Sequence, residues 1–297
     1  MLTSFSKVID KLIYARLLDH ITTNSILVNE KYGFRIRYST EQASFSLINT
    51  ILTATNNNLK IGDIFCDLQK AFDCVNHKIL LDKLEFYSIE RKFKTLIESY
   101  LTCRYQKVVL NNNTNTNSSL KLELIKNGVP QDSILGPLFF LLYINDLPKI
   151  ITNNNSMVLF TDDTSLLITD SNDLDFNINI NQSINQSINQ SFRNIISWFN
   201  SNLLTLNFNK TQYVEFRKKN YYQVKTKVKY EHKYISNSTE TKFLGQIIDA
   251  TLSWNQHIDQ IATKLCSACY ALRNLKHIVP QFTLRTIYYT YIHSILS

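Results

Sequence analysis

Apolar residues recur at intervals of three and four in several parts of the chain, a spacing that indicates amphipathic helices. The pattern predicts helices over residues 5–21, 40–52, 257–275 and 281–296. The sequence Ser-Thr-Glu-Gln at 39–42 resembles a capping box, which stabilises the first turn of a helix. Because the helical pattern begins almost at the first residue, we expect the domain to be truncated at its N-terminus.

Two more helices carry less usual signals. Residues 180–190 repeat Ile-Asn-Gln-Ser with a period of four, and the isoleucines continue as an apolar stripe through Phe192, Ile195 and Phe199. Positions four apart lie on nearly the same helix face, so the repeat predicts a helix lengthened by short duplications. A strongly apolar helix is expected to open at Gly136-Pro137, because proline is tolerated in a first turn.

Short apolar runs predict strands, at residues 61–68, 106–110, 121–126, 157–160, 165–169, 213–216, 224–230 and 242–248. The runs at 157–160 and 165–169 flank Asp162 and Asp163, which predicts a hairpin with acids at its tip. Helices and strands do not alternate strictly along the chain. This mixture favours an α+β fold over a doubly wound parallel sheet.

The charge is unevenly distributed along the chain. Residues 205–297 contain 13 Lys and Arg against 5 Asp and Glu, whereas the first 204 residues contain 19 of each. Aromatic residues lie among these basic residues, for example at 217–222 and 225–230. Such a surface suits a polyanion such as nucleic acid, although by itself it fits a solvated basic face equally well.

Five scattered cysteines without a secretory signal argue against a disulfide framework. Cys266 and Cys269 have C-x-x-C spacing, but they lie in a helical pattern without a second pair, so we expect small core residues rather than zinc ligands. The longest apolar run, 138–144, is too short for a membrane helix. A soluble, intracellular protein is expected, with nucleus and cytoplasm not distinguished.

Three acids are candidates for chemistry: Asp67 at the end of an apolar strand, and Asp162 and Asp163 between two apolar runs. Carboxylates beside buried strands are costly unless a cation or a donor satisfies them. Mg²⁺ prefers oxygen ligands and is usually held by one or two carboxylates plus substrate phosphates. If Asp67 lies on the neighbouring strand, the three acids suit metal-assisted phosphoryl transfer.

The sequence segments around these acids resemble the motifs of reverse transcriptases from non-LTR retrotransposons, the jockey-like kind especially. Residues 64–77 (IFCDLQKAFDCVNH) resemble the first catalytic motif, and 127–137 (NGVPQDSILGP) the second, which continues into 143–148 (YINDLP). Residues 160–164 (FTDDT) are similar to the aromatic-x-Asp-Asp signature. All of them occur in the family's order.

The resemblance extends over nearly the whole chain and implies a right-hand polymerase fold with an antiparallel palm sheet. Residues 1–60, which include Tyr-Gly-Phe-Arg at 32–35, would be N-terminally incomplete fingers. Residues 61–252 would be the palm with inserted finger elements, and 253–297 the incomplete start of a helical thumb.

The resemblance also implies the reaction, RNA-directed synthesis of DNA in a mobile element. Two Mg²⁺ ions would be held by Asp67, Asp162 and Asp163. The implied partners are an RNA template, a DNA primer and dNTPs, and the oligomeric state is left open.

Four further residues take roles from the same resemblance. Phe72 would pack against the sugar and exclude a 2'-hydroxyl, although without the resemblance a core phenylalanine is the simpler interpretation. Arg35 would clamp the triphosphate, or else form a surface ion pair. Gln131 would contact the nucleotide or template, or else serve a turn. Lys210 would protonate pyrophosphate, or else be a solvated lysine.

Two substitutions depart from the family pattern. Asp132 stands where the family usually has glycine, and Thr161 replaces a common alanine. Asp132 adds charge and bulk where a backbone normally approaches substrate. The alternative function is therefore a decayed, inactive remnant that only binds nucleic acid. A palm-like nucleotide cyclase or a metal nuclease is a more distant alternative, which would not explain Phe72, Gln131 and the basic C-terminal part together.

Overall fold

A computed structural model gives the fold of residues 4–89, 91–102, 104–106, 109–110, 118–119, 123–130, 133–151, 155–170, 179–218 and 228–296. Within these residues the chain combines helices with mainly antiparallel strands, as the sequence pattern predicts. No helix among them is both long enough and apolar enough to cross a membrane.

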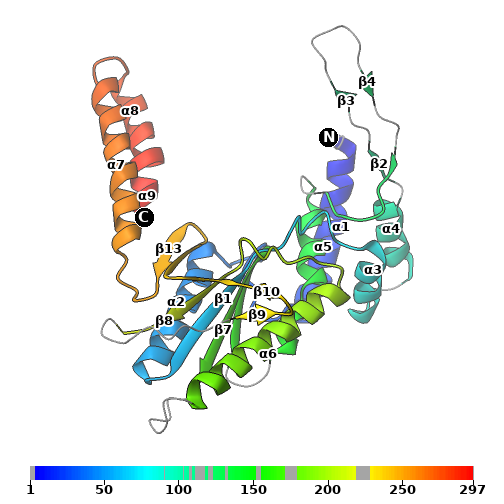
Figure 1. The fold of residues 1–297 in the computed structure, drawn as a ribbon. Coiled ribbons are helices and arrows are strands. Elements are labelled where there is room, and N and C mark those ends of the chain that lie inside the picture. Colours follow the sequence, from blue (N-terminus) through cyan, green and yellow to red (C-terminus); the bar gives the residue numbers. More distant parts are fainter. Residues whose placement is uncertain are drawn as a thin grey trace.

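A five-stranded sheet forms the centre of the molecule (Figure 1). Its strands, in spatial order, are β11 (Ser236–Ser238), β8 (Gln212–Phe216), β1 (Lys60–Cys66), β7 (Asp163–Asp170) and β6 (Ser156–Phe160). Strand β1 pairs antiparallel with both of its neighbours, and only the edge pair β11–β8 is parallel. The sheet therefore brings segments far apart in the sequence to the two sides of β1.

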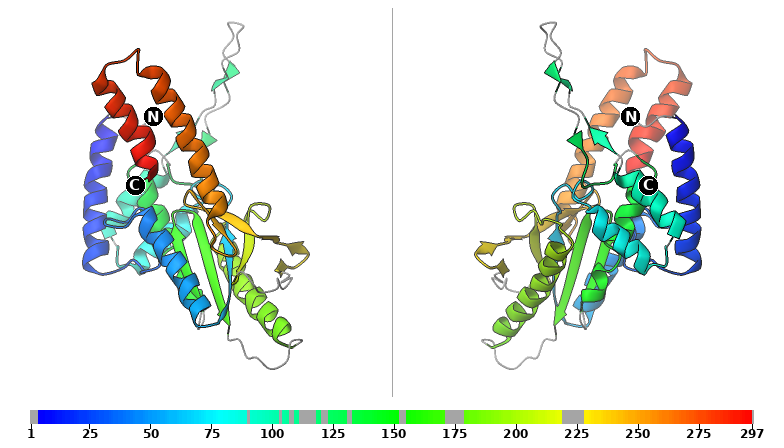
Figure 2. Two further views of the ribbon diagram at one scale, coloured as in Figure 1. Left: turned by 90° about the vertical axis from the view of Figure 1, so that its left-hand side faces the viewer. Right: turned by 90° about the vertical axis from the view of Figure 1, so that its right-hand side faces the viewer.

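Helices cover both faces of this sheet (Figure 2). Helix α2 (Thr40–Asn56) packs on one face, and α5 (Leu135–Tyr143) and α6 (Asn179–Ser201) lie on the other. Side chains alternate along a strand. Accordingly, Ile61 and Phe65 of β1 join the α2 cluster, while Ile64 and Cys66 join the core beneath α5 and α6.

The N-terminal part builds the side of the molecule next to α5. Its elements are α1 (Ser4–Thr23), α3 (His77–Phe86) and α4 (Arg91–Thr102), with η1 (Leu147–Ile150) after α5. Two short ribbons follow α4, namely β2 (Tyr105–Gln106) with β5 (Glu123–Leu124), and β3 (Val109–Leu110) with β4 (Ser118–Ser119). Ser39 caps α2 in the predicted capping box with Gln42.

The C-terminal part ends in a helical hairpin that stands apart from α1 on the other side of the sheet (Figure 1). Two small ribbons precede it, β9 (Lys229–Tyr230) with β10 (Lys233–Tyr234), and β12 (Glu240–Phe243) with β13 (Gln246–Asp249). The hairpin consists of α7 (Asn255–Leu275) and α8 (Gln281–Tyr288), continued by η2 (Tyr289–His293) and α9 (Ser294–Leu296).

Some sequence predictions need correction. The predicted strand 242–248 is two strands, because Leu244 and Gly245 adopt positive φ angles and turn the chain between β12 and β13. Cys266 and Cys269 are exposed on α7 rather than buried, since this helix projects from the body and buries none of its residues. They form no disulfide.

Two apolar residues of the helical pattern at 40–52 are exposed, Phe45 by 71% and Leu52 by 44%. The buried face of α2 is formed by Leu47, Ile51 and three small residues, and small side chains let the helix approach the sheet closely. Of the predicted strand 224–230, residues 224–227 lie outside the described residues.

Candidate functional site

Asp67 and Asp163 lie at the same end of the central sheet. The register of β1 and β7 ends at the pair Cys66–Thr164, so Asp67 directly follows β1 where Asp163 begins β7. The two carboxylates are close enough for the charge of Asp67 to raise the pKa of Asp163. The sheet therefore brings together two of the three acids identified in the sequence.

Asp162 lies in the turn that joins β6 to β7. Phe160 pairs with Asp163, so Thr161 and Asp162 form a two-residue hairpin loop. Thr161 has φ +57°, a left-handed conformation that is unfavourable for a β-branched residue. Strain of this kind persists where the surrounding structure holds it in place.

The carboxyl group of Asp163 is poorly disposed to carry a charge. Asp163 keeps an edge exposed to water, but burial of its carboxyl, together with the charges of Asp162 and Asp67, raises its pKa to about 6. A bound cation would lower the pKa of Asp163 and so offset the effect of the two neighbouring carboxylates. Among the described residues, no group of three His, Cys, Asp or Glu side chains has a geometry that would hold a metal ion by itself.

A segment after α6 fixes the backbone of Asp67. The Asn207 N–H donates to the Asp67 carbonyl at 2.8 Å, and the Asp67 N–H donates to the Thr211 hydroxyl at 3.4 Å. Lys210 follows in the same turn, with Nζ 4.0 Å from Oδ2 of Asp67 and a side chain that is 70% exposed. An exposed ion pair adds little stability, so the approach of Lys210 matters through its position.

The first residues of the second motif are anchored to the segment that carries Phe72. The Val129 N–H donates to the Phe72 carbonyl at 2.9 Å, and the Gly128 N–H donates to the Val75 carbonyl at 2.7 Å. Gly128 has φ +89°, and a Cβ atom there would lie 2.9 Å from the Asp73 carbonyl oxygen. Only glycine meets both conditions. Gln131 and Asp132, which come next, lie outside the described residues.

Phe72 and Arg35, which are predicted to contact the nucleotide, both have partners within the chain. The Phe72 ring stacks on Phe140 with ring centroids 4.8 Å apart. The guanidinium of Arg35 donates to the Val28 carbonyl at 2.8 Å and lies 4.4 Å from the ring centroid of Tyr38. Arg35 is therefore tied to its own segment rather than to any of the three acids.

The N-terminal segment reaches the acidic turn through Gly33. The Tyr32 N–H donates to the Leu159 carbonyl at 2.9 Å, which places this segment beside β6. A Cβ atom on Gly33 would lie 2.4 Å from the Thr161 backbone nitrogen, a distance that no side chain tolerates. Gly33 thus lets residues before α2 touch the hairpin loop that carries Asp162.

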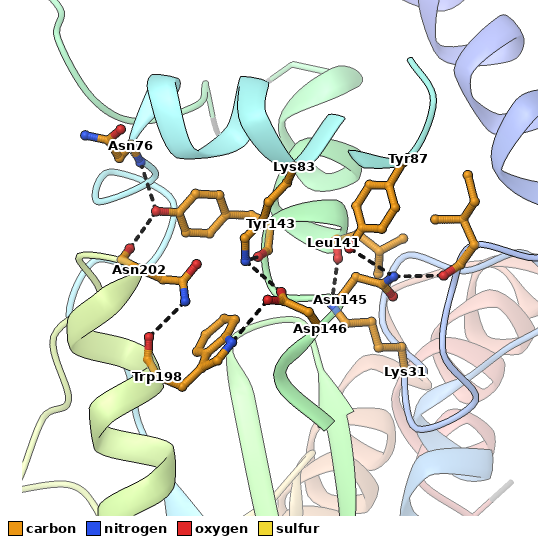
Figure 3. Close-up of polar contacts among 11 residues, drawn as sticks. Lys31, Asn76, Lys83, Tyr87, Leu141, Tyr143, Asn145, Asp146, Trp198 and Asn202 are labelled. Atoms are coloured by element: carbon orange, nitrogen blue, oxygen red, sulfur yellow. Dashed lines mark hydrogen bonds and ion pairs between the residues drawn. The ribbon is translucent and has the colours of Figure 1, made fainter. Parts of the chain in front are cut away.

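Two polar residues that sequence reasoning missed hold this segment in place (Figure 3). Lys31 is 1% exposed, and its Nζ donates to the Leu141 carbonyl at 2.7 Å. Burial, together with the charge of Lys83, lowers the pKa of Lys31 well below its ordinary value. Asn145 is fully buried and donates to the Ile26 carbonyl at 2.8 Å. The sequence feature that could have pointed to Asn145 is its place in the motif at 143–148.

A second part of this network joins α3 to α6 (Figure 3). Lys83 donates from Nζ to Oδ1 of Asp146 at 2.6 Å and to the Tyr143 carbonyl at 2.6 Å. The Trp198 indole donates to the other Asp146 oxygen at 3.2 Å. The Lys83 side chain is 15% exposed and that of Asp146 is 37% exposed, so this partly exposed ion pair adds little stability. Through it and the indole bond, Asp146 ties α3 to α6.

Comparison with known proteins matches the resemblance found in the sequence. The chain is 26% identical over 297 residues to the probable RNA-directed DNA polymerase from transposon BS of Drosophila melanogaster, covering 99% of this chain and 32% of that protein. It is 26% identical over 263 residues to the RNA-directed DNA polymerase from mobile element jockey of Drosophila funebris, covering 88% and 27%. The chain thus spans about a third of the length of these relatives.

Among solved structures, the chain is similar to apo telomerase from Candida tropicalis truncated from the C-terminal domain. The TM-score is 0.49 at 14% identity, with 82% of this chain and 44% of that chain covered. Residues 1–248, which include every acid of the candidate site, match the family described as reverse transcriptase (RNA-dependent DNA polymerase). The chain therefore belongs to the reverse transcriptase family.

Proposed function

We propose that this chain is the polymerase part of an RNA-directed DNA polymerase of a mobile element. The observation that carries the proposal is that the register of β1 and β7 brings Asp67 and Asp163 to the same end of the sheet, in a chain of the reverse transcriptase family. The primer 3'-hydroxyl oxygen would form a bond to the α-phosphorus of a dNTP as the bond to pyrophosphate breaks. Lys210, whose Nζ lies 4.0 Å from Oδ2 of Asp67, would give a proton to the leaving pyrophosphate.

Asp67, Asp162 and Asp163 fit two Mg²⁺ ions by their chemistry. Carboxylate oxygens are hard ligands, and Mg²⁺ usually takes only one or two carboxylates besides waters and substrate phosphates. The raised pKa of Asp163 is a further argument, because a cation would offset the repulsion from Asp162 and Asp67. When bound, the ions would stabilise the charge on the entering and leaving oxygens.

Three further residues would select and hold the nucleotide. Phe72 would lie against the sugar and leave no room for a 2'-hydroxyl. Arg35 would bind the triphosphate after exchanging its present carbonyl partner, since a guanidinium forms stronger bonds to phosphate than to a neutral carbonyl. Gln131 would contact the nucleotide or the template.

The arrangement of elements supports a right-hand polymerase architecture, which we propose with the boundaries given above. Residues 1–60 would form fingers, residues 61–252 the palm with its central sheet, and residues 253–297 the start of a thumb built from α7 and α8. An RNA template and a DNA primer would lie between the outer parts, where the basic residues of the C-terminal part face their phosphates.

Primer extension on a homopolymer RNA template with Mg²⁺ tests the proposal. Asp163→Asn should abolish extension, because it removes a ligand charge while keeping the size of the side chain. Asp19→Asn, at an exposed position of α1, is the matched control and should extend normally. Full activity of folded Asp163→Asn would rule out the metal role. Template binding without extension by the parent chain would instead support the inactive remnant.

A further inference from the structure

Three aromatic rings form a column beside the acidic turn. Phe140 is 1% exposed at the base, and Phe72 stacks on it with ring centroids 4.8 Å apart. Phe34 then meets Phe72 edge to face, with centroids 6.3 Å apart and ring planes at 83°. Each ring comes from a different part of the chain, since Phe34 precedes α2, Phe72 follows β1 and Phe140 lies in α5.

The backbone presents Phe34 at a conformational cost. Its φ is +55°, in the left-handed region that bulky residues rarely adopt. The side chain is 46% exposed, so the burial of apolar surface offsets this cost only in part. Strained, partly exposed residues of this kind concentrate at functional sites. Gly33, the residue before Phe34, packs closely against Thr161 and so fixes where the backbone enters Phe34.

The same ring also lies beside the hairpin loop of the acids. A small cavity of about 10 Å³ is lined by Phe34, Phe140 and Thr161 among others. This volume is close to the minimum for one water molecule and leaves no room for a side chain. Phe34 therefore contacts the space behind the acidic turn on one side and Phe72 on the other.

We propose that Phe34 is a specificity-determining residue that fixes the tilt of the Phe72 ring and so sets how strongly a 2'-hydroxyl is excluded. The inference rests on the proposed function, in which Phe72 faces the sugar of the nucleotide. Phe140 stacks on the Phe72 ring, and Phe34 meets the same ring edge to face. Without Phe34, the Phe72 ring tilts toward the vacated space and admits the extra hydroxyl.

The test measures the ratio of kcat/KM for dATP to kcat/KM for ATP. Phe34→Gly removes the ring and also relieves the left-handed backbone, so loss of folding is not expected. The ratio should fall about three- to tenfold, the range that corresponds to one edge-to-face ring contact. Phe34→Tyr keeps the ring and should keep the ratio. Phe45→Ala, which removes an exposed phenylalanine from α2, is the matched control and should also keep it.

Phe72→Ala separates failure of this inference from failure of the proposed function. If Phe72→Ala lowers the ratio but Phe34→Gly leaves it unchanged, the role of Phe34 is overturned. If neither variant changes the ratio, the role of Phe72 itself is wrong. Equilibrium binding of dATP and ATP with Ca²⁺ in place of Mg²⁺ gives a second readout without turnover. A preference for dATP that Phe34→Gly does not reduce would overturn the inference there too.

Discussion

Asp63 is a carboxylic acid buried within the central sheet, two residues before Phe65 on the face that α2 covers. It is 0% exposed and accepts a hydrogen bond from the Ser165 hydroxyl at 2.6 Å. Burial raises its pKa to about 7, against about 4 in an unfolded chain. The folded protein holds this proton up to about pH 7, whereas the unfolded chain loses it near pH 4. Stability from this group therefore declines as pH rises from 4 to 7.

Asp63→Asn should remove this decline, because the amide oxygen still accepts from Ser165 and carries no charge. At pH 8 the variant should be more stable than the parent by roughly 4 kcal/mol, and near pH 4 the two should be similar. Urea unfolding at several pH values measures the difference. Parallel stability curves for parent and variant would show that Asp63 does not titrate in this window.

Asp163 should make activity depend on both pH and magnesium. Its pKa of about 6 means that protons compete with a cation for this carboxylate below that pH. We expect the rate of primer extension to fall below about pH 6 and the midpoint to move to lower pH as Mg²⁺ increases. Template binding measured at each pH controls for loss of the complex. A midpoint that ignores the Mg²⁺ concentration would contradict the role of Asp163.

At the level of elements, the sequence pattern predicted those helices and strands that depend on residues close to each other in the chain. The Ile-Asn-Gln-Ser repeat forms a helix whose buried stripe includes Ile188, Phe192 and Phe199, because positions four apart share a face whatever lies nearby. The apolar runs around the acids form the expected hairpin. Contacts between distant segments carried no local signal. No local pattern distinguishes Lys31, whose burial and bond to the Leu141 carbonyl depend on a segment 110 residues away.

The junction between β13 and α7 depends on one carboxylate. Asp249 accepts bonds from the backbone N–H groups of Thr251, Ser253 and Trp254, at 3.0, 3.0 and 2.8 Å. Burial acts to raise its pKa, but these bonds, with that from the Thr251 hydroxyl, outweigh it and lower the pKa to about 2. Leu252 and Trp254 adopt positive φ, so the carboxylate holds a strained turn.

Asp249→Ala should therefore loosen the helical hairpin relative to the sheet. The bonds that fix the turn are lost, and the strained residues relax. Primer extension should still start, but products made in a single binding event should be several-fold shorter, and proteolysis at residues 250–254 should be faster. Asp259→Ala, at an exposed position on α7, is the control. Unchanged product length with unchanged proteolysis would mean that other contacts orient the hairpin.

At the scale of the whole molecule, the C-terminal helical hairpin projects away from the central sheet (Figure 1). Arg273 of α7, Lys276 directly after α7 and Arg285 of α8 line one groove of about 850 Å³, and no acid lines it. Tyr288 and Tyr289 form part of the same groove. Clustered cations beside exposed aromatic rings suit a nucleic-acid backbone better than a protein surface with balanced charge. The uneven charge of the sequence is thus concentrated, in part, on one face of the hairpin.

Replacing Arg273, Lys276 and Arg285 together by glutamine should weaken binding of an RNA–DNA duplex and make it less dependent on salt. A plot of log K against log salt has a negative slope, and each lost phosphate contact should make that slope less steep by about 0.9. The slope of the triple variant should therefore be less steep than that of the parent by up to about 2.7. Fluorescence anisotropy with a labelled duplex over a range of salt gives the slope. The control replaces Lys7, Lys11 and Arg16, which are exposed on α1, and so removes the same charge elsewhere. An equal loss of slope in both variants would mean that net charge, rather than the groove, attracts the nucleic acid.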